Sequence, residues 1–565
     1  MQTEAALQTF LQRQGAHCPT GSLLAETSAE AETLWTALVA DSRLIETANA
    51  SHTIFVALAG AHHHGVDFLP EVVALGVRCV ITDEAGWQRL QQQAPAMVKQ
   101  TVVWVVPEAW DLRAQAQLAD WFYRHPSQQL QLLGVTGTNG KTSVAHLSAQ
   151  LLQAQGWAVG VMGTLGVGLW QQGQWQGQSS ANTTPEPFML HQQLAAWVQE
   201  GVQVAVMEVS SHAIALGRIA ALQFHALALT QVTRDHLDFH GSLATYQAVK
   251  QALFLDWPAQ YWVLNAQDKI GLSLAAPQAA TAIRLQPLTQ LTLYSADCQA
   301  LSQCLEAHPV TQTASQVHRL CFEQCQPTAE GWWLQWQETA HHRQQANLPL
   351  LGRFQLENLL AAWGLVQSVG GAVTAQALTQ LQPLPGRMQW IRPPAYAQGE
   401  VSAEPEGPRV LVDYAHTPDA LSTVLSDLKR HWPQQKTATP PKLWLVMGCG
   451  GDRDQGKRAQ MGAVAAQWAD EVILTNDNPR GEAPMQIVQS ILQGMSPSRQ
   501  QQTQVCLDRP AAIAAALTQA QPKDWVLVAG KGHETTQTIE GRVLPMSDIE
   551  IVKKLLQAPL QTTTQ

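Results

Sequence analysis

The sequence predicts an α/β protein with three domains. Short apolar runs of strand length alternate with helical stretches along nearly the whole chain, which is typical of mainly parallel sheets with helices on both faces. A chain of 565 residues is also too long for one hydrophobic core. We expect a smaller N-terminal α/β domain at residues 1–128, a central doubly wound sheet at 129–383 and a Rossmann-like C-terminal sheet at 384–565.

The expected strands are apolar runs bounded by polar or glycine-containing segments. They lie at residues 53–58, 77–82, 102–106, 130–135, 158–162, 202–207, 226–230, 410–412, 443–447, 472–475, 505–507 and 525–528. Helical periodicity predicts helices at 143–155, 186–199 and 357–367. The Gln-rich region 268–345 is weakly patterned, and we expect loops and extra strands packed around the central sheet. Residues 393–408 are expected to form a surface loop.

Composition excludes several classes of protein. The chain is 45% hydrophobic and 14% charged, which suits a soluble globular protein. A net charge of −10 argues against a protein that coats nucleic acid. The polar N-terminus has no apolar core of a signal peptide, and no run approaches the roughly 18 apolar residues of a membrane span. The eight cysteines lack zinc-site spacing, so we expect eight reduced thiols in a cytoplasmic protein.

The first functional signal is GTNGKT at residues 137–142, between a predicted strand and a predicted helix. Glycines let backbone N–H groups approach phosphates, and the helix N-terminus adds positive potential. Lys141 can reach the outer phosphates, and the Thr142 hydroxyl can bind Mg²⁺. The segment therefore predicts a phosphate-binding loop (P-loop) for a nucleoside triphosphate. It is a variant loop, because Gly134 and Gly140 enclose five residues instead of four. The alternative is an ordinary strand-to-helix turn.

Further polar segments follow other predicted strands. Glu208 ends the strand at 202–207, and Asp413 ends the strand at 410–412. Four more such segments begin at Thr233, Gly448, Asp477 and Gly530. Each alone could be a solvated loop. Together, on two sheets, they predict a cleft between the central and C-terminal domains.

The motifs and their order resemble one family. They are NTTP at 182–185, EVSSH at 208–212, RDHLDFHG at 234–241, YQAVK at 246–250, GRM at 386–388, DYAHTPD at 413–419, GCGGDRD at 448–454, DNPR at 477–480 and GKGHE at 530–534, together with the GTNGKT loop. Over nearly the whole length, the chain resembles the Mur ligases, the ATP-dependent amide ligases of peptidoglycan assembly.

The resemblance implies a reaction. It is closest to the members that add meso-2,6-diaminopimelate to UDP-N-acetylmuramoyl-L-alanyl-D-glutamate. A carboxylate does not react with an amine at neutral pH, whereas the acyl phosphate formed with ATP does. The resemblance implies this route, with ATP as co-substrate and two Mg²⁺ ions. The implied partners are these small molecules, with no nucleic acid and no membrane span, in a cytoplasmic monomer.

The resemblance also assigns residues. The catalytic and metal-binding set is Lys141, Thr142, Glu208, His236 and Lys250. The ATP set is Gly137, Thr138, Asn139, Gly140, Lys141, Thr142, Ser143 and Asn358, with 413–419 near the base and ribose. The set for the nucleotide-sugar peptide is Ser42, Thr183, Thr184, Ser210 and Arg218. The diaminopimelate set is Arg453, Asp477, Asn478, Pro479, Arg480, Gly530 and Glu534.

Two of these residues have plain alternatives. Periodicity alone makes Lys250 a surface lysine on a helix. The resemblance implies that it reacts with CO₂ to form an N6-carboxylysine, whose anionic carbamate attracts Mg²⁺ where an ammonium would repel it. His236 resembles the ligand of the second metal ion. Without the family match, it would be a hydrogen-bonded structural histidine.

Arg480 is expected to decide which amino acid is used. Its planar fork suits the distal carboxylate of diaminopimelate, which lysine lacks. The alternatives are a structural arginine on a turn, and a lysine-adding relative.

Two other functions stay open. A folylpolyglutamate synthetase has a similar loop, but it would not explain the N-terminal block or DNPR. A non-catalytic nucleotide sensor would not need Lys141, Glu208, His236 and Lys250. Finally, His62, His63 and His64 replace an Asp-Gly pair of the family, which we interpret as a different loop and not as a metal site.

Overall fold

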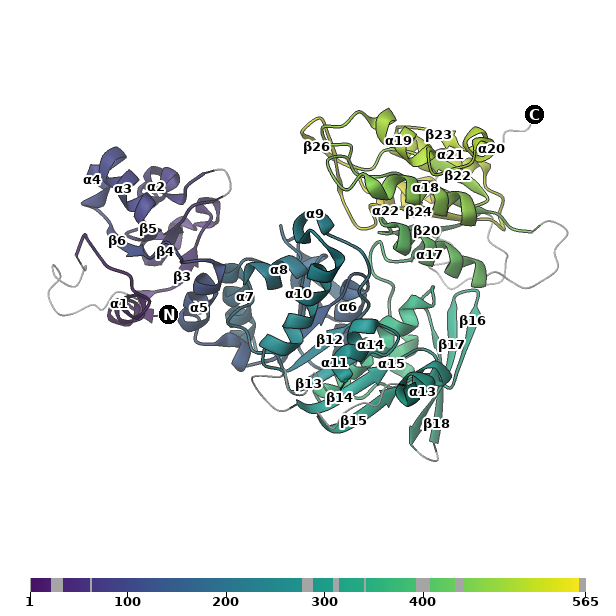
Figure 1. The fold of residues 1–565 in the computed structure, drawn as a ribbon, viewed down its shortest axis with the longest axis horizontal. Coiled ribbons are helices and arrows are strands. Elements are labelled where there is room, and N and C mark those ends of the chain that lie inside the picture. Colours follow the sequence, from purple (N-terminus) through teal and green to yellow (C-terminus); the bar gives the residue numbers. More distant parts are fainter. Residues whose placement is uncertain are drawn as a thin grey trace.

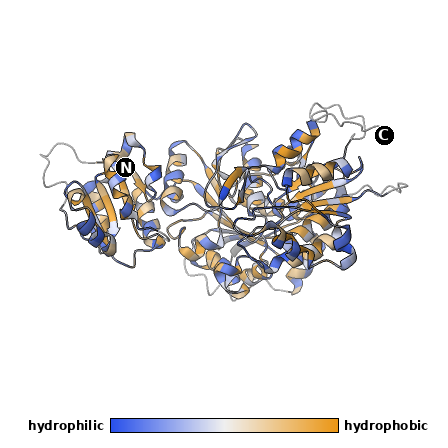
Figure 2. Ribbon diagram, turned by 90° about the horizontal axis from the view of Figure 1, so that it is seen from above, coloured by the Kyte–Doolittle hydropathy of each residue, from blue (hydrophilic) through white to orange (hydrophobic). Residues whose placement is uncertain are grey.

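The computed structural model describes residues 2–21, 34–60, 63–276, 288–307, 314–339, 342–392, 407–431 and 440–557. Three main sheets follow one another along the chain and give the molecule an elongated shape, with the N-terminal unit at one end and the C-terminal unit at the other (Figure 1). Many strands of the main sheets are hydrophobic, whereas hydrophilic residues lie along the outer helices (Figure 2). The predicted α/β class is therefore confirmed.

The N-terminal unit has a parallel four-stranded sheet. Its order is β3 (Ala37–Val39), β4 (Thr53–Ala57), β5 (Cys79–Asp83) and β6 (Val102–Val106). The other elements are β1 (Gln2–Thr3), α1 (Glu4–Arg13), β2 (Leu34–Trp35), α2 (Leu69–Ala74), α3 (Glu84–Gln93), α4 (Pro95–Val98) and α5 (Leu112–Phe122). The sheet packs α1 and α5 in one apolar cluster and α2 and α3 in another.

The central unit has a nine-stranded sheet in the order β10-β9-β8-β11-β7-β12-β13-β14-β15. Its strands are β7 (Gln131–Thr136), β8 (Val159–Gly163), β9 (Gly166–Gln171), β10 (Gln174–Gln178), β11 (Val204–Glu208), β12 (Ala226–Leu229), β13 (Tyr261–Asn265), β14 (Leu288–Tyr294) and β15 (Ala314–Leu320). Strand β9 runs antiparallel to its two neighbours, β8 and β10, and the other neighbouring pairs of this sheet are parallel. The chain crosses from one side of β7 to the other between β11 and β12, and ligands bind at such switch points.

Helices cover both faces of the central sheet. One face packs α6 (Lys141–Gln153), α14 (Phe354–Ser368) and α15 (Ala375–Thr379). The other packs α7 (Pro187–Gln199), α8 (Ser211–Leu216), α10 (Leu243–Asp256) and α11 (Lys269–Ala275). The short α9 (Leu237–His240) precedes α10. This is the doubly wound arrangement that the alternating pattern predicts.

The region 268–345 differs from its prediction. Strands β14 and β15 are not packed around the central sheet but extend it, joined by α13 (Cys298–Ala307). Strand β14 reads LTQLTLY, which mixes polar with apolar residues and so lacks the continuous apolar run of an inner parallel strand. A separate antiparallel sheet of β16 (Gln324–Thr328), β17 (Gly331–Thr339) and β18 (His342–Leu348) follows.

The cysteine prediction was wrong for two residues. Cys298 and Cys321 form a disulfide, with Cα atoms 5.1 Å apart. Cys298 follows β14 and Cys321 follows β15, so parallel neighbours bring them to the same edge of the sheet. Spacing in the sequence, 23 residues, gives no sign of this pairing. The other six cysteines, all within the described residues, are not disulfide-bonded.

The C-terminal unit has a six-stranded sheet in the order β19-β20-β24-β21-β22-β23. Its strands are β19 (Gln389–Ile391), β20 (Arg409–Asp413), β21 (Leu443–Met447), β22 (Glu471–Leu474), β23 (Gln504–Val505) and β24 (Trp525–Ala529), and only β19 is antiparallel. Its helices are α17 (Pro418–Arg430), α18 (Gly456–Trp468), α19 (Pro484–Leu492), α20 (Pro497–Gln502), α21 (Arg509–Gln519) and α22 (Asp548–Gln557). A hairpin of β25 (Thr536–Ile539) and β26 (Arg542–Pro545) precedes α22.

Two points bear on the sequence predictions. The expected surface loop at 393–408 falls almost wholly outside the described residues. Among the helices of the described residues, none is long and apolar enough to cross a membrane. The domain boundaries at 128/129 and 383/384 remain our proposal.

A buried ion pair fixes the last helix to the C-terminal sheet. Arg509 and Asp548 meet at 2.7 Å and both side chains are fully buried. The guanidinium also donates hydrogen bonds to the carbonyl oxygens of Asn476 and Ala529. The pair therefore joins α21 and α22 to the ends of two strands.

Removing one partner tests this anchor. Asp548→Ala leaves a buried guanidinium without its counter-charge, and we expect urea unfolding to show a loss of about 3–5 kcal/mol. Glu550→Gln, in an exposed pair with Lys553 on the same helix, is the control and should change stability little. Equal stability of the two variants would contradict the role of the pair.

Candidate functional site

The loop between β7 and α6 has the backbone that phosphate binding requires. Gly137 and Gly140 have φ angles of +146° and +89°, and a Cβ at Gly137 would lie 1.8 Å from the Thr230 hydroxyl oxygen. Helix α6 begins at Lys141, and no side chain caps its N-terminus. The first backbone N–H groups of the helix therefore face the loop without a capping hydrogen bond. Such a helix terminus is a ready anion site.

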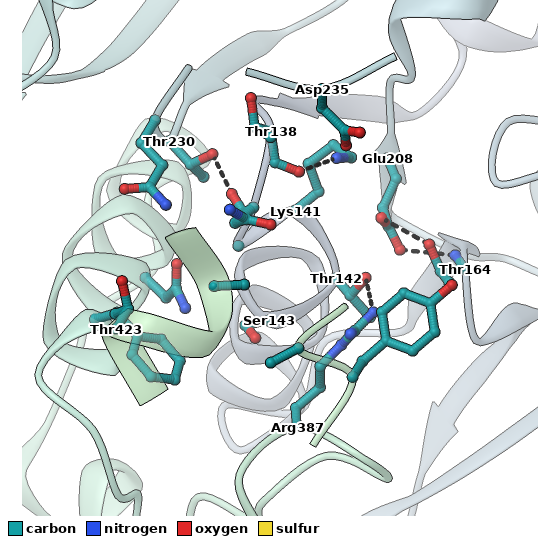
Figure 3. A pocket seen from close by; sticks show the side chains of 18 of the residues that line it. Thr138, Lys141, Thr142, Ser143, Thr164, Glu208, Thr230, Asp235, Arg387 and Thr423 are labelled. Carbon is teal, nitrogen blue, oxygen red and sulfur yellow. Dashed lines mark hydrogen bonds between the residues drawn. The ribbon is translucent and has the colours of Figure 1, made fainter. Parts of the chain in front are cut away.

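The loop lines a cavity of about 300 Å³ between the central and C-terminal units (Figure 3). Most of the predicted ATP and catalytic residues meet there. They are Thr138, Asn139, Gly140, Lys141, Thr142, Ser143, Glu208, His236, Lys250 and Asn358, with Thr183 and Ser210 of the sugar-peptide set. The C-terminal unit closes the cavity with Arg387, Asp413, Tyr414, Ala415 and His416.

Lys141 is held inside the loop. Its Nζ donates hydrogen bonds to the carbonyl oxygens of Gly137 (2.9 Å) and Thr138 (2.8 Å). Burial lowers its pKa most; the charge of Arg387 adds to this, and Glu208 and Asp235 oppose it. The cation therefore stands at the phosphate end of the cavity, with carboxylates close by.

Two oxygen donors suit a magnesium ion bound together with phosphates. The Glu208 carboxylate accepts hydrogen bonds from the backbone N–H (2.7 Å) and hydroxyl (3.1 Å) of Thr164. The Thr142 hydroxyl accepts one from Arg387 at 3.3 Å. Within the described part of the chain, no three His, Cys, Asp or Glu side chains group as an all-protein metal site. Mg²⁺ is usually bound by one or two carboxylates and substrate phosphates, which this donor set fits.

His236 lies beside these groups with its ring 3.4 Å from the Asp235 carboxylate. Burial lowers its pKa to about 4, although Asp235 opposes the shift. The imidazole is therefore neutral near pH 7, as a metal ligand must be. Its ring centroid lies 4.9 Å from that of His212, so the region is crowded with imidazoles.

Lys250 is buried, so the surface-lysine alternative is wrong. Only 1% of it is exposed. Its Nζ donates to the Thr136 hydroxyl at 3.2 Å and lies 5.0 Å from the ring centre of Tyr246. Burial, with the nearby charge of Lys141, lowers its pKa well below the usual value. Helix periodicity alone could not predict this burial, because the contact to Lys250 comes from Thr136 at the end of β7, which is far away in the sequence.

The residues predicted to bind the sugar-peptide form a connected group beside the cavity, which we call the rim: Thr183, Thr184, Ser210 and Arg218. The Thr184 hydroxyl donates to the Glu208 carbonyl oxygen at 2.8 Å and accepts from the Ser210 N–H at 3.0 Å. Arg218 donates to the Thr184 carbonyl oxygen at 3.3 Å and pairs with Glu186 at 2.8 Å. Thr184 and Arg218 therefore stand behind the cavity wall, next to Thr183 and Ser210.

Ser42 is not part of this cavity. It begins a 3-10 turn, Ser42–Leu44, in the N-terminal unit. In the same unit, His64 is buried, bonds Asp83 at 2.9 Å and caps the turn Gly65–Phe68, so it has a structural role. His62 lies outside the described residues.

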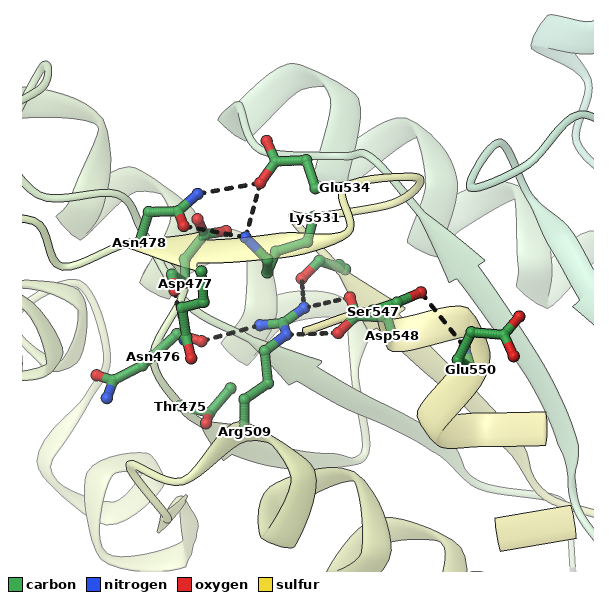
Figure 4. A network of polar contacts seen from close by, with 12 residues as sticks. Thr475, Asn476, Asp477, Asn478, Arg509, Lys531, Glu534, Ser547, Asp548 and Glu550 are labelled. Atoms are coloured by element: carbon green, nitrogen blue, oxygen red, sulfur yellow. Dashed lines mark hydrogen bonds and ion pairs between the residues drawn. The ribbon is translucent and has the colours of Figure 1, made fainter. Parts of the chain in front are cut away.

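The diaminopimelate set gathers at the edge of the six-stranded sheet and does not line the cavity. Lys531, which is fully buried, donates to Asn478 (3.1 Å) and Glu534 (2.7 Å), and the Asn478 amide also donates to Glu534 at 3.0 Å (Figure 4). Arg480 has φ +51° and donates to the Gly451 carbonyl oxygen at 2.8 Å.

The remaining predicted residues lie around this network. A Cβ on Gly530 would come 2.8 Å from the Asp477 carboxylate, and one on Gly451 would meet the Pro479 carbonyl oxygen. Arg453 follows the same segment, within 3.8 Å of where a Cβ on Gly450 would stand. The loops after β21, β22 and β24 therefore converge.

A chain of side chains links the cavity to this network. The Arg387 guanidinium contacts Thr142 and lies 4.5 Å from the ring centre of Tyr414. The Tyr414 ring lies 5.2 Å from that of His533, the neighbour of Glu534. The cavity and the Asn478–Glu534 network are therefore linked by side-chain contacts.

The sequence reasoning missed four residues of these sites. Arg387, Tyr246 and Lys531 lie in the motifs GRM, YQAVK and GKGHE but received no role. Thr164 follows β8 outside any motif, and only the fold places it beside Glu208.

Comparisons with known proteins identify relatives of the two units that form the cavity. Residues 135–366 match the family model of the Mur ligase middle domain, and residues 386–532 match the Mur ligase glutamate ligase domain. A UDP-N-acetylmuramoyl-L-alanyl-D-glutamate–2,6-diaminopimelate ligase of Coxiella burnetii is 37% identical over 528 residues, 93% of this chain and 96% of that protein.

Two solved structures are also similar. One is a UDP-N-acetylmuramoyl-L-alanyl-D-glutamate–2,6-diaminopimelate ligase, with 30% identity, a TM-score of 0.56, and coverage of 92% of this chain and 94% of that one. The other is the Mycobacterium tuberculosis folylpolyglutamate synthase, at 18% identity and a TM-score of 0.50, over 74% of this chain and 92% of that one. The second likeness is one of fold alone.

Proposed function

The chain belongs to the Mur ligase family, and we propose that it uses ATP to join meso-2,6-diaminopimelate to the D-glutamate of UDP-N-acetylmuramoyl-L-alanyl-D-glutamate. One observation carries the proposal most. The triphosphate cavity is completed by Arg387 and Tyr414 of the C-terminal unit, and contacts run from there to the Asn478–Glu534 network. The geometry suits a reaction that brings a phosphate donor, an acid and an amine together.

In this mechanism, the side chains bind and orient charged groups. The loop N–H groups and Lys141 hold the β- and γ-phosphates, and Lys141 exchanges its two carbonyl contacts for phosphate oxygens. Lys141 and Arg387 stabilise the negative charge that develops as the acid is phosphorylated. The rim of Thr183, Thr184, Ser210 and Arg218 positions the acid, and Ser42 contacts the uridine diphosphate end.

Magnesium and a modified lysine complete the proposed site. Thr142 and Glu208 would hold one Mg²⁺, and His236 and carbamylated Lys250 a second, which would neutralise phosphate charge. An uncharged amine is the form that reacts with CO₂, and burial favours that form of Lys250 by lowering its pKa. The balance of this reaction is simple: the nitrogen lone pair forms a bond to the carbon of CO₂, and one proton leaves.

The diaminopimelate network favours this amino acid over lysine. Arg480 can form a bidentate contact with a distal carboxylate, while Asn478 and Glu534, fixed by Lys531, can accept or orient the amino end. The lysine-adding alternative leaves Arg480 without a partner in the substrate. We also propose a cytoplasmic location, because ATP and UDP-linked precursors are cytoplasmic substrates. The monomeric state implied by the family resemblance stays a prediction.

The competing functions make different predictions. A folylpolyglutamate synthetase would not need the N-terminal four-stranded sheet or the DNPR segment, and the identity with that enzyme is only 18%. A nucleotide sensor would bind ATP without turnover.

Product analysis tests the proposal. The protein is incubated with ATP, Mg²⁺, the nucleotide dipeptide and either meso-diaminopimelate or lysine, and products are identified by mass spectrometry. We expect an amide product and ADP with diaminopimelate, and at most trace product with lysine. A lysine product of equal yield would replace the proposed substrate, and ATP binding without any product would favour the sensor.

A further inference from the structure

Glu357 has a carboxylate oxygen that the structure leaves without a partner inside the nucleotide cavity. The residue lies in the first turn of α14 and lines the cavity. Its Oε1 accepts a hydrogen bond from the Ala296 N–H at 2.9 Å. Its Oε2 is buried and accepts no hydrogen bond from the described residues. Burial raises the pKa of this carboxyl to about 7, although the Ala296 contact opposes the shift.

The position of Glu357 is at the end of the cavity where a base would lie. Its neighbour Asn358 touches the loop, because a Cβ on Gly140 would come 2.4 Å from the Asn358 side-chain oxygen. Glu208 and Thr164 mark the opposite end, and Figure 3 shows Thr423 on the far side of the loop from them. With phosphates on the loop, the nucleoside must extend away from Glu208.

The walls at this end suit a flat heterocycle. Phe354 of α14 and Ala420 and Val424 of α17 line it with apolar surface. Pockets of this kind use a few placed polar groups to fix the orientation of a ligand. A buried acceptor without a partner costs free energy, and a donor on the ligand would remove that cost.

We propose that Glu357 in its ionised form selects the purine base, with its free oxygen accepting a hydrogen bond from the 6-amino group of adenine and repelling the 6-carbonyl oxygen of hypoxanthine or guanine. This inference rests on the proposed use of ATP. The other carboxylate oxygen, bound to Ala296, fixes the side chain in place. The Glu357 carboxyl thus binds the segment that follows β14 with one oxygen and the purine base with the other.

A purely structural role would leave base choice unchanged, so the readout is a ratio. Binding of ADP and of inosine diphosphate, each with Mg²⁺, is measured by calorimetry, which needs no turnover, at a pH well above the pKa of about 7 so that the carboxyl is ionised. We expect the unaltered protein to bind ADP about 10- to 100-fold more tightly. In Glu357→Gln, whose amide can donate to the carbonyl oxygen of hypoxanthine, the preference should fall to about threefold or less.

Two further variants complete the design. Glu357→Ala should also lose the preference, mainly through weaker ADP binding, while Glu550→Gln keeps it. A ratio unchanged in Glu357→Gln, or an unaltered protein that binds both nucleotides equally, would overturn the inference. Glu357→Gln is nearly isosteric, so it remains informative if the alanine variant fails to fold. An unaltered protein that binds neither nucleotide would instead overturn the proposed use of ATP.

Discussion

Replacing Lys250 by alanine is expected to lower the turnover number by about 10²- to 10³-fold, in the range seen when one charge-stabilising group is removed from an active site. The proposed carbamate supplies an anionic oxygen beside Thr136 and Tyr246. Turnover is measured as phosphate release with all three substrates. Bicarbonate, which brings an anionic oxygen into the space left by the side chain, should restore part of the activity.

The unaltered protein should also depend on CO₂ and on pH. Burial lowers the pKa of Lys250 well below its usual value, so more of its amine is in the uncharged form that can react with CO₂. As pH falls, protonation removes the reactive amine and carbamate formation reverses. Activity should therefore decrease at lower pH, and it should also decrease when CO₂ is removed. Incubation with ¹³C-bicarbonate should give one carbamate signal that Lys250→Ala lacks.

The control for Lys250 is an exposed lysine on the next helix. Lys269→Ala at the start of α11 should leave turnover and the carbamate signal unchanged. Full activity of Lys250→Ala, or of the unaltered protein in CO₂-free buffer, would refute the carbamate.

Replacing Arg480 by alanine should have the second large effect. We expect kcat/KM for meso-diaminopimelate to fall by about 10³- to 10⁴-fold, because a site built around a polar contact loses most when that contact is absent. The value for lysine should change little, since lysine has no carboxylate at that position. The selectivity between the two amino acids therefore collapses.

Arg480 also donates to the Gly451 carbonyl oxygen, so a loss of activity alone would not separate binding from structure. The ratio of kcat/KM for the two amino acids separates them, because distortion of the loop would lower both. Arg542→Ala, on the exposed strand β26, is the matched control. If Arg480→Ala reduced both values in proportion, the proposed carboxylate contact would be wrong.

Local patterns predicted much of the fold. The continuous apolar runs at 102–106 and 443–447 coincide with β6 and β21, and most other predicted strands lie within a residue or two of the observed ones. Strand β14 was not placed in the sheet, because its polar residues hide an inner parallel strand. The Cys298–Cys321 bridge depends on which strands are neighbours, which no local spacing encodes.

The candidate site also contains some residues that local sequence patterns predict and others that they do not. The phosphate loop is local, so its glycines and Lys141 were predictable from adjacent residues. The burial of Lys250 and the cavity face of Glu357 depend on contacts with β7 and with the segment after β14. Helix periodicity places a residue on a face of its own helix, but it does not say what covers that face.

A small molecule that binds at the phosphate loop shares its cavity with the Arg387 guanidinium, which donates to Thr142 and lies over the Tyr414 ring. That ring packs on His533, the neighbour of Glu534. A ligand that contacts Arg387 and Tyr414 as well as the loop would therefore use groups of the C-terminal unit that the loop alone does not supply.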